Sequence, residues 1–333
     1  MSHNIPRILI PKTTYTLTDY PEFVEMADKQ NSVFWTHDEI KVEKDVQDIL
    51  TNMTPAEKHG VLTVLKLFTL YEVEIGDEYW GGRVATTFKR PEIQRMASSF
   101  QFFELNVHAP FYNKINEALG LATDEFYSSY ADDPVLNARM EFIGNALDNP
   151  DHLLSTAIFS MIEGAVLYSN FAFLKHFQSE GKNKLLNIVR GINFSVRDEN
   201  LHSIAGAAIF KRLKAEMEAL GMDTSYVEAL IMAAADMIRE HEFRIIDMIF
   251  EKGKIPGITD VQMKHFVESR INLCLRELGY NNRYEVKYNP ISEWFYKGIN
   301  NFQFNDFFSG MGNQYNRSWD ESAFKFIRRN VNV

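Results

Sequence analysis

Long stretches of apolar residues at three-to-four spacing, with few breaks between them, constrain the fold of this chain more than any other feature. This spacing places the apolar side chains on one face of an α-helix, and several stretches end at glycine or near proline, as helices do. Only 17 glycines and 10 prolines occur in 333 residues, and no low-complexity linker divides the chain. The helical stretches are residues 55–80, 91–119, 152–178, 184–220, 225–252 and 259–278.

These stretches predict an all-α helical bundle that is long enough to enclose a dry core. No alternating strand pattern of useful length occurs before the short run RYEVKY, which begins at residue 283. Thr54 and Pro55 indicate one helix start, since threonine is a good N-cap and proline fits the first helical position. Periodicity is lost from about residue 300, so we expect one helical domain over 1–300 and a tail over 301–333.

Composition and charge argue against several classes of function. The net charge of −10 disfavours a nucleic-acid-binding protein, which normally carries a basic face. No run of eighteen apolar residues occurs, and the N-terminus lacks the basic-then-apolar order of a secretory signal, so we expect a cytoplasmic protein without a membrane span. Cys274 is the single cysteine, so any thiol-driven reduction would need thiols on another subunit.

Two pairs of glutamate and histidine carry the most informative chemistry. In the motif RDENLH, Glu199 and His202 are three residues apart and therefore share one helix face, where they can bind one metal ion. Glu104 and His108 form a similar pair in ELNVH. A single Glu-x-x-His pair arises by chance in many helices, so a metal site can be predicted only if further ligand residues are present.

Each pair is preceded by a lone glutamate in an otherwise apolar segment. Glu163, in SMIEGAVLYSNF, lies 36 positions before Glu199, and Glu72, in LKLFTLYEVEIG, lies 32 positions before Glu104. Helical bundles that bind two metal ions use this arrangement of one Glu from each of two helices and a Glu–His pair from each of two others. The four glutamates balance the charge of two divalent ions, and such oxygen-rich ligands suit iron or manganese better than copper or zinc.

Two details of this pattern stay open at the level of the residues. Glu74 competes with Glu72, because two residues on a helix are separated by about 200° of rotation and both cannot face one site. Glu104 and His108 are four residues apart rather than three, and Pro110 follows. Proline removes a backbone donor, and an inserted residue beside a broken ladder is typical of a π-bulge. We therefore predict a bulge near residues 105–110.

Several motifs resemble the small subunit of class I ribonucleotide reductase, and the resemblance runs through most of the chain. It implies a ferritin-like helical bundle with a dinuclear metal site in its core, and an alignment on Glu57 and Lys58 without gaps places Glu72, rather than Glu74, on the family's first carboxylate. The motifs that carry the resemblance are FWTHDEIKVEKD, TPAEKHGVLTVLKLFTLYE, EGAVLYSNFA, RDENLH, Asn289-Pro290 and NDFFSGMGNQY.

The resemblance also implies a function and a set of partners. Two metal ions, which we expect to be iron with manganese–iron or dimanganese as alternatives, would react with dioxygen and generate a radical on Tyr112, four residues after His108. The family's radical route maps onto His108, Asp198 and Trp35, and Tyr315 matches the residue that passes the radical to the large catalytic subunit. The small subunit is expected to be a homodimer.

The chain departs from the family pattern at several points. The first carboxylate is Glu where many members have Asp, a feature also seen in members with a manganese–iron centre or without a tyrosyl radical. Ser195 replaces an aliphatic residue expected beside Tyr112, and the ending FKFIRRNVNV is basic where the family's tails are commonly acidic.

Two other classes of function share parts of this pattern. A desaturase, a hydrocarbon monooxygenase or a ligand-binding oxidase would use the same glutamates and histidines, but would not need Trp35, Asp198 and Tyr112 together. A ferritin-like store is usually near half this length. The sequence therefore favours the small subunit of a ribonucleoside-diphosphate reductase.

Overall fold

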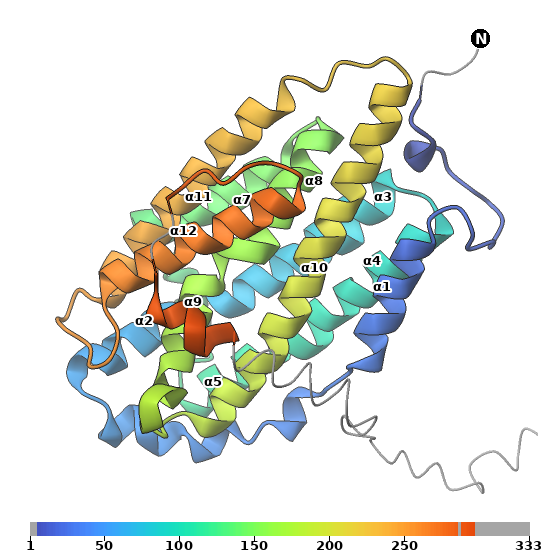
Figure 1. The fold of residues 1–333 in the computed structure, drawn as a ribbon. Coiled ribbons are helices and arrows are strands. Elements are labelled where there is room, and N and C mark those ends of the chain that lie inside the picture. Colours follow the sequence, from blue (N-terminus) through green and yellow to red (C-terminus); the bar gives the residue numbers. More distant parts are fainter. Residues whose placement is uncertain (1–4, 286–287, 297–333) are drawn as a thin grey trace, which may run out of the picture.

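The protein is an elongated assembly of helices, shown by a computed structural model that describes residues 5–285 and 288–296 (Figure 1). No β-strand occurs in these residues, and Ile255 and Ile258 form an isolated bridge. This architecture confirms the predicted all-α fold. The boundary predicted between residues 300 and 301 lies outside the described residues, as does the predicted tail.

The helices follow one another with short connections. The α-helices are α1 (Pro21–Ser32), α2 (Pro55–Val73), α3 (Ala85–Thr87), α4 (Pro91–Phe103), α5 (Ala109–Ala118), α6 (Asp124–Ser128), α7 (Pro134–Asp148), α8 (His152–Met161), α9 (Tyr168–Lys175), α10 (Leu186–Ala219), α11 (Val227–Ile249) and α12 (Asp260–Glu277). Short 3₁₀ helices are η1 (Arg7–Leu9), η2 (His37–Glu39), η3 (Val42–Lys44) and η8 (His176–Gly181), and π-helical segments are η4 (Asp48–Asn52), η5 (Glu74–Val84), η6 (Glu104–His108) and η7 (Ile162–Val166).

The helix boundaries agree with local signals in the sequence. The side chain of Thr54 accepts a hydrogen bond from the backbone N–H of Glu57, whose own side chain accepts from the Thr54 N–H, and Pro55 occupies the first turn of α2. This reciprocal capping satisfies two backbone donors that a helix start leaves free. Thr259 and Gln262 begin α12 in the same way. Residues 290–296 form one further helix.

The longest helix, α10, runs along the length of the bundle and packs closely on α8 (Figure 1). Ser160 on α8 and Ser203 on α10 each donate a hydrogen bond to the other's carbonyl oxygen at 2.8 Å. A Cβ built at Gly206 would lie 3.1 Å from the Ser160 Cα, so a small residue is needed at this crossing. The two serines satisfy polar groups at a contact that water does not reach.

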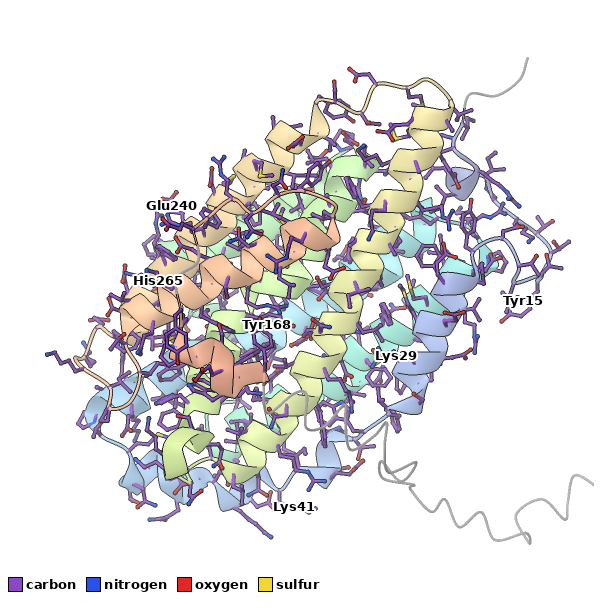
Figure 2. All side chains as sticks on the ribbon, in the orientation of Figure 1. Tyr15, Lys29, Lys41, Tyr168, Glu240 and His265 are labelled. Carbon is purple, nitrogen blue, oxygen red and sulfur yellow. The ribbon has the colours of Figure 1, made fainter. Side chains whose placement is uncertain are left out.

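Within the described residues, one helical run, His152–Ser179, is long and apolar enough to cross a membrane by length and composition. The most apolar window of this run is entirely buried inside the protein, which makes it a core helix of the bundle. Figure 2 shows the same contrast between interior and surface, with Tyr168 of this run inside the bundle and Lys29, Lys41 and Glu240 at its periphery.

Candidate metal centre

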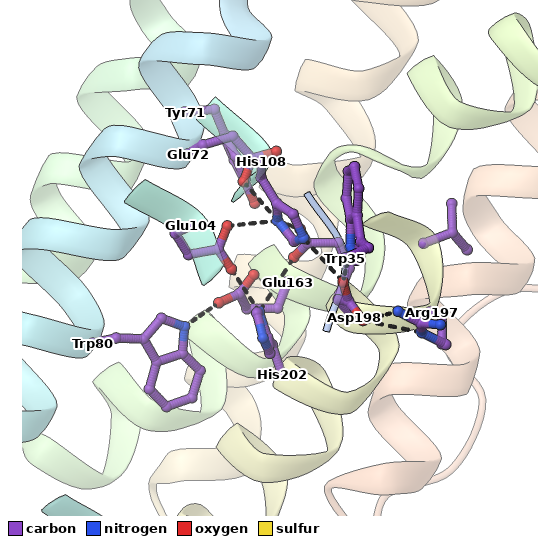
Figure 3. A network of polar contacts seen from close by, with 12 residues as sticks. Trp35, Tyr71, Glu72, Trp80, Glu104, His108, Glu163, Arg197, Asp198 and His202 are labelled. Carbon is purple, nitrogen blue, oxygen red and sulfur yellow. Dashed lines mark hydrogen bonds and ion pairs between the residues drawn. The ribbon is translucent and has the colours of Figure 1, made fainter. Parts of the chain in front are cut away.

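Six acidic and histidine side chains meet inside the bundle and form two overlapping groups (Figure 3). In each group, one potential ligand atom per residue can be chosen so that all lie within 4.8 Å of one another. Glu104 and Glu199 belong to both groups, so their paired oxygens can serve two neighbouring ions. The first group is Glu72, Glu104, His108 and Glu199, and the second group is Glu104, Glu163, Glu199 and His202.

The histidine nitrogens lie directly among the carboxylate oxygens. His108 Nδ1 is 2.9 Å from Glu104 Oε2, 3.1 Å from Glu199 Oε1 and 3.6 Å from Glu72 Oε2. His202 Nδ1 is 2.6 Å from Glu104 Oε1 and 3.8 Å from Glu199 Oε2. The structure thus brings together all six residues that the sequence analysis selected as metal ligands.

The polar atoms of this cluster lack the partners that buried polar atoms normally have. All six side chains are buried, with at most 2% of any of them exposed. Both oxygens of Glu72 and Oε2 of Glu163 make no hydrogen bond. Four carboxylates out of water with two histidines between them are costly unless further cations compensate their charge. The residues therefore fit a pair of divalent metal ions.

The electrostatics of the cluster point to the same need for cations. Burial raises the pKa of Glu72 and Glu163 well above the usual range, and the nearby carboxylates add to the rise. Burial, with Glu104 and Glu72, raises the pKa of Glu199 to about 8. Burial opposes charge on His108, but Glu104, Asp198 and Glu199 together outweigh it and the pKa of this imidazole is raised. Protons thus compete with metal ions for these ligands.

We predict that metal ions stabilise the protein more strongly as pH rises. In the metal-free fold the raised carboxyl pKa values mean that the native state binds more protons than the unfolded chain between about pH 5 and pH 9, so its stability falls as pH rises through this window. Bound metals replace these protons and remove the loss. The difference in Tm between manganese-loaded and chelator-treated protein should therefore increase from pH 6 to pH 8.5. A Tm difference that does not change with pH would show that protons and metal ions do not compete for these carboxylates, and would contradict this prediction.

Three of the four glutamates lie in or next to a π-helical segment. Glu104 and His108 begin and end η6, so the bulge predicted near residues 105–110 is confirmed and begins one residue earlier. Glu163 lies within η7, and Glu72 lies two residues before η5. Such segments are rare and gather at functional sites. The wider turn lets both side chains of the Glu104–His108 pair face the cluster despite the extra residue.

Asp198 links the cluster to Trp35 and Arg197. Its Oδ2 lies 3.2 Å from His108 Nε2 and accepts a hydrogen bond from Trp35 Nε1 at 2.8 Å. Arg197 donates two hydrogen bonds to the other oxygen, both at 3.1 Å. Burial alone would raise the pKa of Asp198, but Arg197 and His108 outweigh it and the pKa is lowered. A carboxylate on the far nitrogen fixes the tautomer and orientation of a ligand histidine.

Tyr112 lies in a dry aromatic pocket. Its ring stacks on Phe68, with centroids 4.3 Å apart and planes 5° apart, and Phe111 lies 5.0 Å away. The hydroxyl is buried, and the side chain of Ser195 lies beside it. Burial, reinforced by the charge of Glu72, raises the pKa of Tyr112 well above its usual value. Phe68, one turn before Glu72, is the closer of these two contacts, and the sequence analysis did not select it.

Sequence reasoning also missed Trp80, whose Nε1 donates a hydrogen bond to Glu163 Oε1 at 2.7 Å (Figure 3). Its position two turns after Glu72 was the available signal, but a tryptophan on an apolar helix face is also what a core position contains. Glu74, the alternative to Glu72, belongs to neither group. Tyr315 lies outside the described residues.

The fold and the cluster together define a class of protein, the helical bundle whose core carboxylates and histidines are arranged for two metal ions. The family model described as "Ribonucleotide reductase, small chain" matches residues 12–290. The chain therefore belongs to the ribonucleotide reductase small chain family.

Similar proteins agree with this assignment. The chain is 28% identical over 306 residues to the ribonucleoside-diphosphate reductase subunit beta of Halalkalibacterium halodurans, covering 87% of this chain and 85% of that one. It is 25% identical over 329 residues to a probable ribonucleoside-diphosphate reductase small subunit of invertebrate iridescent virus 3, covering 93% and 85%. A crystal structure of a class I ribonucleotide reductase from Bacillus halodurans shares the fold with a TM-score of 0.75 at 24% identity, covering 84% of this chain and 99% of that one.

Proposed function

We propose that this chain is the metal- and radical-bearing small subunit of a class I ribonucleoside-diphosphate reductase. The observation that carries the proposal is the pair of buried ligand groups that share Glu104 and Glu199, with Tyr112 sealed beside them. A separate large subunit binds and reduces the ribonucleotide. This division agrees with the single cysteine of the chain, because the reducing thiols then belong to the large subunit.

The six residues of the two groups hold two metal ions, and we expect both to be iron. Manganese–iron and dimanganese pairs are the alternatives, because the same ligands accept both metals. The metals and dioxygen supply a one-electron oxidant when bound. His108 would offer Nδ1 to the first ion after releasing one proton to solvent, because Asp198 would keep the other ring proton on Nε2.

Tyr112 stores the oxidising equivalent. Its raised pKa keeps the phenol protonated, so its oxidation removes a proton as well as an electron. A charged phenol would be costly among Phe68, Phe111 and their neighbours. The same aromatic walls exclude water and external reductants, which a stored radical requires.

A line of hydrogen bonds joins His108, Asp198 and Trp35. This line would lead from the metal centre toward the large subunit. This line carries the oxidising equivalent between the two subunits, with Tyr315 and the segment 301–333 completing the route at the interface. Two copies of the chain associate as a homodimer. Light scattering on the purified protein measures that assembly directly.

Reconstitution of the wild type and of Trp35→Phe tests the proposed function. Chelator-treated wild type loaded with iron or manganese in air should show a tyrosyl radical by paramagnetic resonance and should yield deoxyribonucleotide with the large subunit. Trp35→Phe should keep the metals and the radical, since it removes the donor to Asp198 but keeps an aromatic ring against His108 and Phe111. Its turnover should fall to the assay background.

Two results would overturn this function. Wild-type protein that binds two metals but co-purifies with a long-chain lipid and supports no nucleotide reduction would be a substrate oxidase. Full turnover by Trp35→Phe would exclude the proposed line through Asp198.

A further inference from the structure

The π-helical segment that carries Glu163 is held by buried side chains from three other elements. Three of its backbone carbonyls, on alternate residues, accept hydrogen bonds from these side chains. The bonds run from Tyr71 Oη to Ile162 O at 3.1 Å, from Arg270 Nε and Nη2 to Gly164 O at 2.9 and 2.8 Å, and from Arg139 Nη2 to Val166 O at 2.6 Å. Side-chain bonds to helix carbonyls are a recognised cause of local departures from the α-helical ladder.

Two of the three donors are guanidinium groups in the protein core, where an unpaired charge is expensive. Arg139 is ion-paired with Glu242, which also accepts a hydrogen bond from Ser169. Arg270 has a different environment, because no carboxylate of residues 5–285 or 288–296 pairs with it. Its guanidinium lies 3.7 Å from the centre of the Tyr168 ring.

Arg270 is thus retained at a buried position where it serves backbone and aromatic partners instead of a counter-ion. It is 2% exposed, and it also donates a hydrogen bond to the hydroxyl of Tyr296 at 3.1 Å. Two of its bonds converge on the carbonyl oxygen of Gly164, the residue that follows Glu163. A planar guanidinium can make both bonds at once, whereas an ammonium group is a single point charge.

Close packing holds the same segment in addition to these hydrogen bonds. A Cβ built at Gly164 would lie 2.4 Å from both Cys274 Sγ and Ser203 Oγ, so the backbone of η7 lies directly against α12 and α10. All five residues of η7 are buried. A displacement of the backbone at Glu163 therefore requires breaking contacts with several helices.

Glu163 belongs to the second ligand group only, whereas Glu104 and Glu199 serve both groups. We propose that Tyr71, Arg139 and Arg270 are positioning residues that hold Glu163 and set the metal affinity of the second site, leaving the first site unchanged. This inference rests on the proposed dinuclear centre. Metal ligands must be held within about 0.5 Å of their productive geometry, and outer-shell substitutions typically weaken metal binding by about 10- to 100-fold.

Manganese titration of the chelator-treated full-length protein, followed by paramagnetic resonance, tests the inference. Wild type should bind two ions that give a coupled signal. Arg270→Lys keeps the charge but loses the paired bonds, so its second ion should bind about 10- to 100-fold more weakly while the first is unaffected. At one equivalent the spectrum should then be that of an isolated ion. Tyr71→Phe removes one hydroxyl from the same segment and should show a smaller loss at the same site.

Arg83→Lys is the matched control. Arg83 also donates to backbone carbonyls, those of Leu147 and Asn149, but touches no carbonyl of η7. The Arg83→Lys variant should bind both manganese ions with wild-type affinity even if its Tm is lower. Equal weakening of both ions in Arg270→Lys, or unchanged binding in a folded Arg270→Lys or Tyr71→Phe, would overturn the inference. Wild-type protein that does not bind two ions would overturn the proposed function, and this inference with it.

Discussion

Tyr112→Phe should abolish ribonucleotide reduction while leaving both metal ions in place. The substitution removes a buried hydroxyl beside Ser195 and keeps the ring that stacks on Phe68. We therefore expect the free energy of unfolding to change by about 1 kcal/mol or less, because the contact with Ser195 is the one polar interaction of this hydroxyl that the substitution removes. The tyrosyl signal should disappear, and turnover with the large subunit should fall to the assay background.

A second tyrosine substitution makes this result interpretable. Tyr79→Phe also removes a buried tyrosine hydroxyl, from a ring stacked on Phe159, and should retain both the radical and the activity. Normal turnover in Tyr112→Phe would show that the oxidising equivalent is stored elsewhere, on the metals or on another aromatic residue.

Glu199→Gln should weaken both metal sites together. Glu199 is shared by the two ligand groups, so its loss affects each ion. Substitutions of residues that only support a ligand weaken metal binding by up to about 100-fold, so we expect the loss of a direct ligand to weaken it by more than about 100-fold. The metal-free variant should be at least as stable as metal-free wild type, since it loses a carboxylate that burial and Glu104 hold at a raised pKa of about 8. Isothermal titration and thermal unfolding measure the two effects.

Glu74→Gln is the control for this substitution. Glu74 lies two residues from Glu72 but belongs to neither ligand group, so this variant should bind two ions with wild-type affinity. A Glu74→Gln protein that loses an ion while Glu72→Gln keeps both would reverse the assignment of the first carboxylate.

Much of the architecture was predictable because helix periodicity and capping are local properties of the chain. The predicted stretch 184–220 corresponds to α10 at Leu186–Ala219, and Thr54 caps α2 as expected. The six candidate ligands were predictable for a different reason. Glutamates in apolar helical segments need compensation, and their repeated spacing relative to two histidines restricts what can compensate them.

The interactions that support the site were harder to predict, because they join residues far apart in the chain. Trp80 bonds to Glu163 across 83 positions, and Arg270 bonds to Gly164 across 106. Neither residue belongs to a local motif, and each is equally compatible with ordinary core packing. The π segment at Glu104 was predictable from the extra residue and Pro110, whereas η7 at Ile162–Val166 has no such signal.

Anomalous diffraction from crystals loaded with manganese or iron tests the central claim most directly. We predict two anomalous peaks per chain, one bound by Glu72 and His108, the other by Glu163 and His202, with Glu104 and Glu199 contacting both. A single peak, or a second peak with Glu163 turned away from it, would contradict the dinuclear centre on which the proposed function depends.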